Sequence, residues 1–239
     1  MAAISKVQPF IIDFKKKREL RQLKNYELVY NAIKDNDKDE FYKNINHNTL
    51  KKLLENTGLD FSQFWEKCTS DEIYCKTASI PLSKCSSRQG SIDEKVQLDA
   101  CNKTSQQFGI DVIKLTNRQL RPSKDGHIIT YEDMKQKNIE KDDCLKSFDG
   151  KVQGNMNGFI TSKITYDNGG HQDNVFAEIY TLCDWWNNYK ASDTNEYLIA
   201  LIDTDLSRQL NALKEKYITN SNIKIFSHVE FQQYIIDNY

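Results

Sequence analysis

The sequence predicts an α/β protein, with a central mixed sheet flanked by helices and an N-terminal helical segment. Three observations indicate this class. Residues 14–66 show helical apolar spacing, the second half alternates short apolar runs with amphipathic stretches, and 197–202 is continuously apolar, as in a buried parallel strand. A chain of 239 residues can hold one large domain, or a domain with a helical appendage. We expect a helical segment over 1–80, packed on a core over 81–239.

The first third of the chain is expected to be helical. Residues 27–33 have helical apolar spacing, 48–54 begin with a capping-type residue, and 60–65 form another amphipathic turn. After the polar stretch 84–90, Ser91 is a suitable N-cap and Glu94 stands where it would close a capping box. This predicts a helix that begins near 91 and ends before Gly109.

The remaining elements alternate between strand and helix. Strands are expected at 112–115 and 128–131, the second after a turn at 124–126, and residues 132–143 are charged and expected to be exposed. The order then predicted is a strand at 158–165, a helix at 172–189, a strand at 197–202, a helix at 205–217, a strand at 223–226 and a helix at 229–237. Helices between strands favour an α/β sheet layered by helices.

Composition limits the function classes. Hydrophobic residues make up 38% and charged residues 28%, and no run of about 18 apolar residues exists, which argues against a membrane span. The first residues lack the apolar core of a secretion signal, so we expect a cytoplasmic protein with reduced thiols rather than disulfides. The net charge of −1 neither supports nor excludes a polyanionic partner, although 15–18 and 118–124 are locally basic.

Three candidate catalytic residues lie in the stretch 147–178. Five of the nine glycines fall between Gly150 and Gly170, so the backbone there must turn tightly or approach another segment closely. In the strand between them, alternation places Phe159, Thr161, Lys163 and Thr165 on one face. A lysine in an apolar strand is costly unless it has a partner. Asp149 upstream and Glu178 on the following helix are the candidate partners.

These residue types suit hydrolysis of a phosphodiester. A divalent metal neutralises developing charge and activates water, and a fixed cation beside the phosphate assists it. Magnesium accepts two carboxylates and a backbone carbonyl, and keeps several waters. Glu178 can supply the carboxylate that Thr161 lacks, and Glu94 on the earlier helix is a further candidate metal ligand. The polar residues 171–174, at a glycine-rich helix entrance, offer phosphate ligands.

At these positions the chain resembles the PD-(D/E)XK nucleases, and specifically the type II restriction endonucleases. The similarity comprises Arg-x-Gly-x-x-x-Glu at 88–94, Asp149 at a turn, and a strand ending in x-x-Lys before Gly-Gly-His-Gln-Asp-Asn at 169–174. One branch of the family has Ser or Thr in place of the carboxylate before x-Lys, with a glutamate on the next helix. Thr161-Ser162-Lys163 followed by Glu178 is similar to that branch. The resemblance covers about 88–205.

The resemblance implies a restriction-endonuclease-like core and a set of roles. Asp149 and Glu178 are expected to hold Mg²⁺ with the main-chain carbonyl of Ser162, and Glu94 to tune that metal or bind a second one. Lys163 is expected to position or activate the water and to stabilise the pentavalent phosphate. The chain departs from the family where Phe148 replaces the proline and Thr161 is not acidic. The second metal ligand therefore stays open between Glu178, Asp173 and Glu94.

The function expected from these residues is Mg²⁺-dependent cleavage of double-stranded DNA at a specific sequence, by a homodimer with one site per strand. The alternatives are a DNA-binding or defence protein with a degenerate nuclease site, and a metal-dependent phosphohydrolase acting on nucleotides. Trp185 and Trp186 are expected in the core rather than stacked on bases. The side chains expected to contact DNA are Arg88, Gln89, Arg118, Gln119, Arg121, His171, Gln172 and Asn174.

Overall fold

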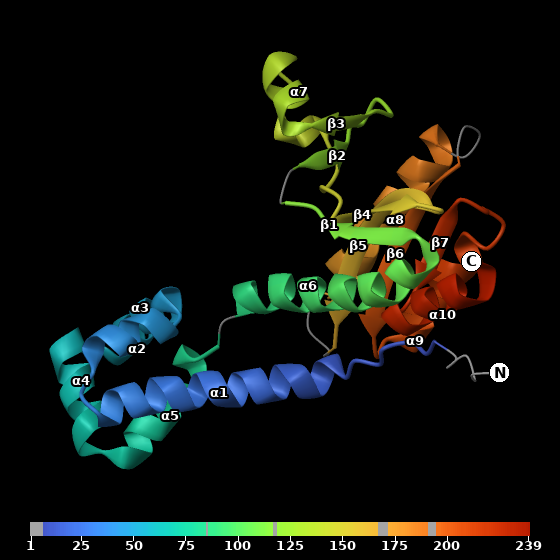
Figure 1. Ribbon diagram of the computed structural model, residues 1–239. Helices are drawn as coiled ribbons and strands as arrows, with labels where there is room; N and C mark the ends of the chain where they lie inside the picture. The colour runs from blue at the N-terminus through green and yellow to red at the C-terminus, as the bar shows by residue number, and fades with distance from the viewer. Residues whose placement is uncertain (1–6, 85, 117–118, 167–171, 191–194) are drawn as a thin grey trace, which may run out of the picture. The chain divides into compact units, whose positions relative to one another are not determined.

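The computed structural model describes residues 7–84, 86–116, 119–166, 172–190 and 195–239, with the side chains of 86–89 and 172–173 left aside (Figure 1). The chain divides into two compact units, Asp13–Ser91 and Met1–Ile12 with Ile92–Tyr239. The boundary thus falls after Ser91 rather than after residue 80, and the first residues belong to the larger unit.

The smaller unit is helical, as the sequence predicted. Its helices are α1 (Phe14–Lys34), α2 (Lys38–Asn44), α3 (His47–Thr57), α4 (Phe61–Ser70) and α5 (Glu72–Leu82). Each begins after a short polar side chain that accepts a first-turn N–H, namely Asp13, Asp37, Asn46, Asp60 and Asp71. Its own core surrounds Val29, Ile33, Phe41, Phe64 and Leu82.

The larger unit contains a five-stranded mixed sheet in the order β1 (Ile110–Lys114), β4 (Gly150–Gly154), β5 (Asn157–Thr165), β6 (Glu196–Thr204), β7 (Ile223–Phe226). β4 is antiparallel to both of its neighbours, β1 and β5, whereas β5, β6 and β7 run parallel. The prediction of an α/β fold with a mixed sheet is confirmed, as is the parallel pairing expected for the apolar run in β6.

Helices cover both faces of this sheet (Figure 1). One core contains Leu98 of α6 (Ser86–Ser105), Phe231 of α10 (His228–Asn238), and Ile160 and Ile199 of the sheet. The other core lies against α8 (Gln172–Tyr189) and α9 (Ser207–Lys216), and it includes Phe176, Trp185, Trp186, Leu198, Ala200, Ile202 and Leu213. Both tryptophans are buried, so they serve the core, as predicted.

A second, two-stranded sheet pairs β2 (Leu120–Pro122) with β3 (Ile128–Thr130), and α7 (Tyr131–Gln136) follows. Short 3-10 turns lie at Gln106–Phe108 and Lys141–Asp143. Met134 of α7 is buried, so the stretch 132–143 is not wholly exposed, in contrast to the expectation.

Two glycines explain the connection between β4 and β5. Gly154 has φ +113°, which only glycine adopts without strain, and it ends β4. At Gly158 an added Cβ would lie 2.2 Å from the carbonyl oxygen of Tyr197, so only glycine lets β5 approach β6 there. The expectation of a tight turn and a close approach in this stretch is confirmed at these two positions.

Helix α6 begins earlier than the sequence predicted. The helix begins at Ser86, so Ser91 lies inside it and the capping box with Glu94 does not form. Gly90 in a helix interior is less favourable than alanine by only about 1 kcal/mol, so it does not prevent the longer helix from forming. Glu94 instead forms an ion pair with Lys114.

The five cysteines in the described ranges, Cys68, Cys75, Cys101, Cys144 and Cys183, are free and buried. This agrees with reduced thiols at these positions; Cys85 lies outside the described residues. Within the described ranges, no helix combines the length and the apolar character needed to cross a lipid bilayer.

Candidate active site

Asp149 lies in line with β4 rather than in a free turn. Its N–H donates to the carbonyl of Ile160 at 2.9 Å, and its own carbonyl accepts from Leu115 at 3.0 Å, so both neighbouring strands hold its backbone. Its Oδ2 accepts the backbone N–H of Ser162 at 2.8 Å and the hydroxyl of Thr161 at 3.4 Å. The carboxylate is therefore fixed against the second half of β5.

The pairing pattern also orients the carbonyl of Ser162. In a strand, the N–H and C=O of one residue point toward the same neighbouring strand. Because the N–H of Ser162 points at Asp149, the carbonyl oxygen of Ser162 points to that side as well. Thus the two ligands that the sequence analysis assigned to one metal lie on the same side of β5.

Lys163 lies between two carboxylates. Its Nζ is 3.6 Å from Oδ2 of Asp149 and 3.8 Å from Oε2 of Glu178, and its side chain is only 12% exposed. The predicted alternation holds here, because Thr161 and Lys163 both line the pocket beneath α8. Neither distance is short enough for a hydrogen bond, so the ammonium retains donors for another group.

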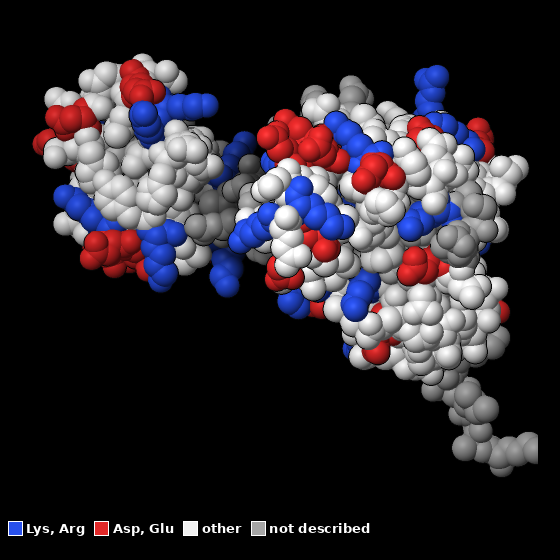
Figure 2. All heavy atoms as spheres, turned by 90° about the horizontal axis from the view of Figure 1, so that it is seen from above, with Lys and Arg blue, Asp and Glu red and all other residues white. Residues whose placement is uncertain are grey.

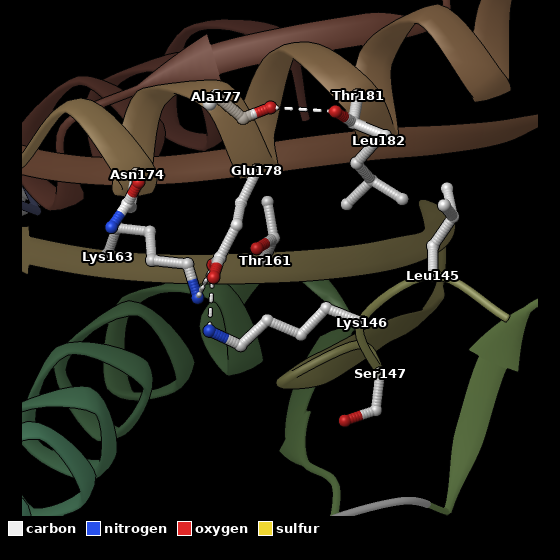
Figure 3. A pocket seen from close by; sticks show the side chains of 10 residues that line it. All are labelled: Leu145, Lys146, Ser147, Thr161, Lys163, Asn174, Ala177, Glu178, Thr181 and Leu182. Carbon is white, nitrogen blue, oxygen red and sulfur yellow. Dashed lines mark hydrogen bonds and ion pairs between the residues drawn. The ribbon is translucent and has the colours of Figure 1, made fainter. Parts of the chain in front are cut away.

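Glu178 projects from α8 toward this lysine, as Figure 3 shows. Its Oε2 also accepts a hydrogen bond from Nζ of Lys146 at 2.7 Å. Lys146 lies on the segment before Asp149. The glutamate is thus brought to the site as predicted, but it is shared between two lysines.

Glu94 approaches from α6. Its Oε1 is 3.0 Å from Nζ of Lys114, the last residue of β1, which is aligned with Gly150 of β4. Burial raises the pKa of the Glu94 carboxyl, and the charge of Asp149 raises it further, whereas Lys114 and Lys163 oppose the shift. This coupling indicates that Glu94 senses the charges of the Asp149–Lys163 pair.

Each of the three carboxylates therefore has a lysine neighbour, in the pairs Glu94–Lys114, Asp149–Lys163 and Glu178–Lys146. The sequence analysis missed Lys114 and Lys146. A signal existed for both, because each adjoins a predicted feature: Lys114 lies in the expected strand 112–115, and Lys146 lies three residues before Asp149.

A pocket of about 420 Å³ opens beside these groups (Figure 3). Lys146, Lys163 and Glu178 supply its charges, and Ser147, Thr161, Asn174 and Thr181 supply its polar groups. Leu145, Ala177 and Leu182 form an apolar wall. The pocket thus combines two ammonium groups with a surface suited to a sugar or a base.

The residues expected to contact DNA differ in their exposure and in their contacts. Asn174 is exposed and lines the pocket. Gln119 is exposed, and its side-chain oxygen accepts from Thr116 to close a turn. Two of the expected residues lie wholly outside the described residues, namely Arg118 and His171. For four others only the side chain lies outside them: Arg88, Gln89, Gln172 and the alternative ligand Asp173.

Arg121 requires a correction. It is only 7% exposed, and its Nη1 donates to the carbonyl of Leu145 at 3.4 Å. A guanidinium buried in this way supports the segment that carries Lys146 and does not face a base edge. The reason is tertiary: β2 pairs with β3 and brings the arginine under the 145–148 segment.

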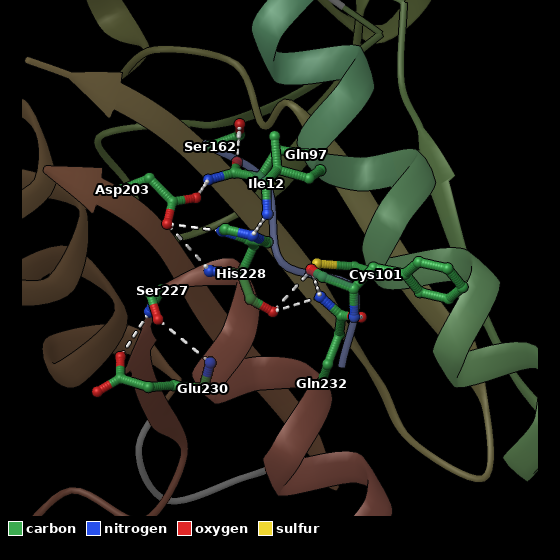
Figure 4. A network of polar contacts seen from close by, with 10 residues as sticks. Ile12, Gln97, Cys101, Ser162, Asp203, Ser227, His228, Glu230 and Gln232 are labelled. Carbon is green, nitrogen blue, oxygen red and sulfur yellow. Dashed lines mark hydrogen bonds and ion pairs between the residues drawn. The ribbon is translucent and has the colours of Figure 1, made fainter. Parts of the chain in front are cut away.

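A second polar cluster lies behind β5, and Figure 4 shows it. The hydroxyl of Ser162 donates to Gln97 of α6, whose amide donates to Asp203 of β6 at 2.6 Å. Asp203 Oδ1 is 2.7 Å from Nδ1 of His228, and Nε2 of His228 accepts the N–H of Ile12 at 3.0 Å. Since Nε2 accepts, Nδ1 carries the proton, which fixes the tautomer.

Gln232 extends this cluster to the first residues of the chain. It accepts from the N–H of Phe10 at 2.8 Å and from the hydroxyl of Thr104 at 2.6 Å, and its amide donates to the carbonyl of Phe10 at 3.1 Å. These contacts explain why residues 7–12 belong to the larger unit. We name the set Ser162, Gln97, Asp203, His228 and Gln232 the buried polar network.

The oxygen donors around Asp149 suit a hard divalent cation. Across the described part of the chain, no three or more His, Cys, Asp or Glu side chains gather closely enough to hold one. An ion at Asp149 would rely on one or two carboxylates, the carbonyl of Ser162 and water. Magnesium tolerates such a set because it keeps several waters and prefers oxygen, so the residues fit it.

Comparison of the chain with family models, curated proteins and solved structures finds no match.

Proposed function

We propose that this protein is a Mg²⁺-dependent endonuclease that cleaves double-stranded DNA at a specific sequence, in the manner of type II restriction enzymes. The observation that carries the proposal is the convergence of Asp149, Lys163 and Glu178 at one end of β5, with an ammonium between two carboxylates. A largely covered lysine with long contacts to both carboxylates is poised for a reacting group rather than for a tight ion pair.

Different residues of the site would bind the metal ion and contact the phosphate. Asp149, the Ser162 carbonyl, Glu178 and Glu94 would hold the ion, which supplies charge neutralisation at the phosphate and a more acidic water. Lys163 would donate to a phosphate oxygen or orient the attacking water, and Asp149 and Glu178 on either side hold its ammonium at the site. Thr161 takes the position of the missing acid and steadies Asp149 through its hydroxyl.

Local groups rather than a broad basic surface would attract the DNA. On the face of the molecule in Figure 2, lysine and arginine are interspersed with aspartate and glutamate, in keeping with a net charge of −1. Phosphate contacts would then come from defined lysines such as those in the pocket. A homodimer with one site per strand suits a two-fold symmetric target.

The test is incubation of the purified protein with phage-sized duplex DNA and Mg²⁺, beside an EDTA control and the Lys163→Ala variant. Discrete fragments that disappear in both controls support a site-specific metal nuclease. A gel shift without cutting supports the alternative of a DNA-binding protein with a degenerate site. Intact DNA with no shift contradicts the proposal.

A second candidate, a metal-dependent phosphohydrolase acting on nucleotides, is favoured by one observation. The pocket has a volume of about 420 Å³ and sets two lysines beside an apolar wall, which suits one nucleotide. Release of inorganic phosphate from free nucleotides, with duplex DNA left intact, distinguishes this activity from the endonuclease.

A further inference from the structure

We propose that Lys146 is a phosphate-binding residue whose ammonium is held by Glu178 until a divalent cation takes that carboxylate. The pocket then binds a backbone phosphate next to the one that is cleaved. This inference rests on the proposed function and names the substrate group that the pocket receives.

The charges of the pocket lining favour an anionic ligand. Among the residues that line the pocket, two are lysines and one is a glutamate, so the lining has an excess of one positive charge. If a divalent ion neutralises Glu178, both ammonium groups face the pocket without a carboxylate of their own there. Such a site favours an anion with several acceptor oxygens, and a phosphodiester is one.

Lys146 and a metal ion would compete for the carboxylate of Glu178. Oε2 of Glu178 lies 2.7 Å from Lys146 and 3.8 Å from Lys163, so Lys146 holds the glutamate more closely. A metal at Asp149 that recruits Glu178 through either carboxylate oxygen withdraws charge from the carboxylate, and this weakens its contact with Lys146. Metal binding and the release of Lys146 are therefore coupled.

Hydrogen bonds hold the segment that presents Lys146 in place. The N–H of Leu145 donates to Pro122 at 2.8 Å, the N–H of Phe148 donates to Leu120 at 3.0 Å, and buried Arg121 donates to the carbonyl of Leu145. β2 thus fixes the backbone on both sides of Lys146. Because the lysine side chain is 58% exposed, it can turn from Glu178 to a phosphate without moving the backbone.

The experiment measures DNA affinity of the full-length protein in Ca²⁺, which supports binding in place of Mg²⁺, and in EDTA. Wild type, Lys146→Ala, Lys146→Arg and the control Lys224→Ala on the far edge strand β7 are compared over a range of salt. In Ca²⁺, Lys146→Ala is expected to raise the Kd roughly 10-fold and to flatten the salt slope by about one. Lys146→Arg and Lys224→Ala are expected to remain close to wild type.

In EDTA, Lys146→Ala and wild type should bind DNA alike, because Glu178 still occupies the lysine. The same variant should bind Mn²⁺ more tightly than wild type, since the competing ammonium is gone. An unchanged Kd and salt slope in Ca²⁺, an equal loss in EDTA, or unchanged Mn²⁺ affinity would each overturn the inference.

Cleavage of the same duplex by wild type in Mg²⁺ separates the two proposals. If wild type cuts and Lys146→Ala binds as wild type does, only the role of Lys146 fails. If wild type neither binds nor cuts, the proposed function fails and this inference with it. Thermal unfolding of each variant verifies that the comparison is made between folded proteins.

Discussion

The two polar regions on either side of β5 are built differently. In the buried polar network, His228, Gln97 and Gln232 are at most 3% exposed and hydrogen-bonded at 2.6–3.1 Å. Beside the pocket, Lys163 faces its two carboxylates at 3.6 and 3.8 Å, and Glu178 is exposed. Closely satisfied buried groups hold a fold together, whereas loosely paired charges at a pocket are free to act on a ligand.

Ser162 belongs to both regions. Its N–H faces Asp149, while its hydroxyl bonds Gln97 in the network. The network thus fixes the strand residue whose carbonyl is offered to the metal. Changes beside the pocket should therefore alter activity, whereas changes in the buried polar network should alter stability.

The largest effect is expected from Lys163→Ala. Cleavage should fall at least about 100-fold, because the variant removes the cation that faces the phosphate. Stability should change little, since Asp149 keeps its hydrogen bonds from Ser162 and Thr161. Initial cleavage rates together with urea unfolding measure both quantities. If Lys163→Ala lost much of its stability but still cleaved DNA at the wild-type rate, the pocket and the buried polar network would not differ in the way described.

The complementary change is His228→Ala. It deprives Asp203 and the N–H of Ile12 of a buried partner, and breaking such a pair typically costs about 3 kcal/mol or more. Urea unfolding followed by circular dichroism measures the loss, with Lys163→Ala as the control. A decrease in the free energy of unfolding of less than about 1 kcal/mol would show that the buried polar network contributes little to stability.

A smaller, pH-dependent effect should come from Glu94. Its pKa is raised above the ordinary 4.5 by burial and by Asp149, so on acidification it takes up a proton earlier than an ordinary glutamate and then cannot ligate a metal. Metal affinity should therefore fall as the pH drops through this raised pKa.

The stability effect of Glu94 has the opposite sign. The folded state holds the proton more tightly than the unfolded state, so this contribution to stability is present at low pH and is lost as the pH rises through the raised pKa. Mn²⁺ affinity and urea unfolding, each against pH, check both statements beside Glu94→Gln. Identical pH profiles for the two proteins would refute them.

The sequence predicted the parallel half of the fold well and the antiparallel half poorly. β5, β6, β7 and the helices between them were found because apolar runs and amphipathic helices alternate there. β4 was missed because Gly150 and Gly154 at its ends resemble a turn, and its pairing with β5 depends on Gly158 lying against β6.

The candidate site was predicted in part for a similar reason. Asp149, Lys163 and Glu178 were found because a strand lysine needs a partner, and they do converge. Lys146 and Lys114 adjoin predicted features, but their pairing with Glu178 and Glu94 could not be inferred, nor could the burial of Arg121, since each depends on contacts between segments distant in the sequence. Likewise, no local pattern pairs Asp203 with His228.

The smallest effect concerns the thiols. Burial raises the pKa of Cys183 on α8 to about 12, and that of Cys68 to about 12, so neither forms a reactive thiolate near neutral pH. A disulfide reagent at pH 8 should modify them only after denaturation. Rapid native labelling of Cys183, located by mass spectrometry, would mean that α8 does not pack on the sheet as described.

The most direct measurement is Mn²⁺ binding, followed by electron paramagnetic resonance, to wild type and to two matched variants, Asp149→Asn and Asp203→Asn. Both changes remove one carboxylate charge from the same unit, one beside the pocket and one in the buried polar network. If Asp149 holds the metal, binding is lost in Asp149→Asn and retained in Asp203→Asn. Equal Mn²⁺ binding by all three proteins would contradict the assignment of the metal-dependent site.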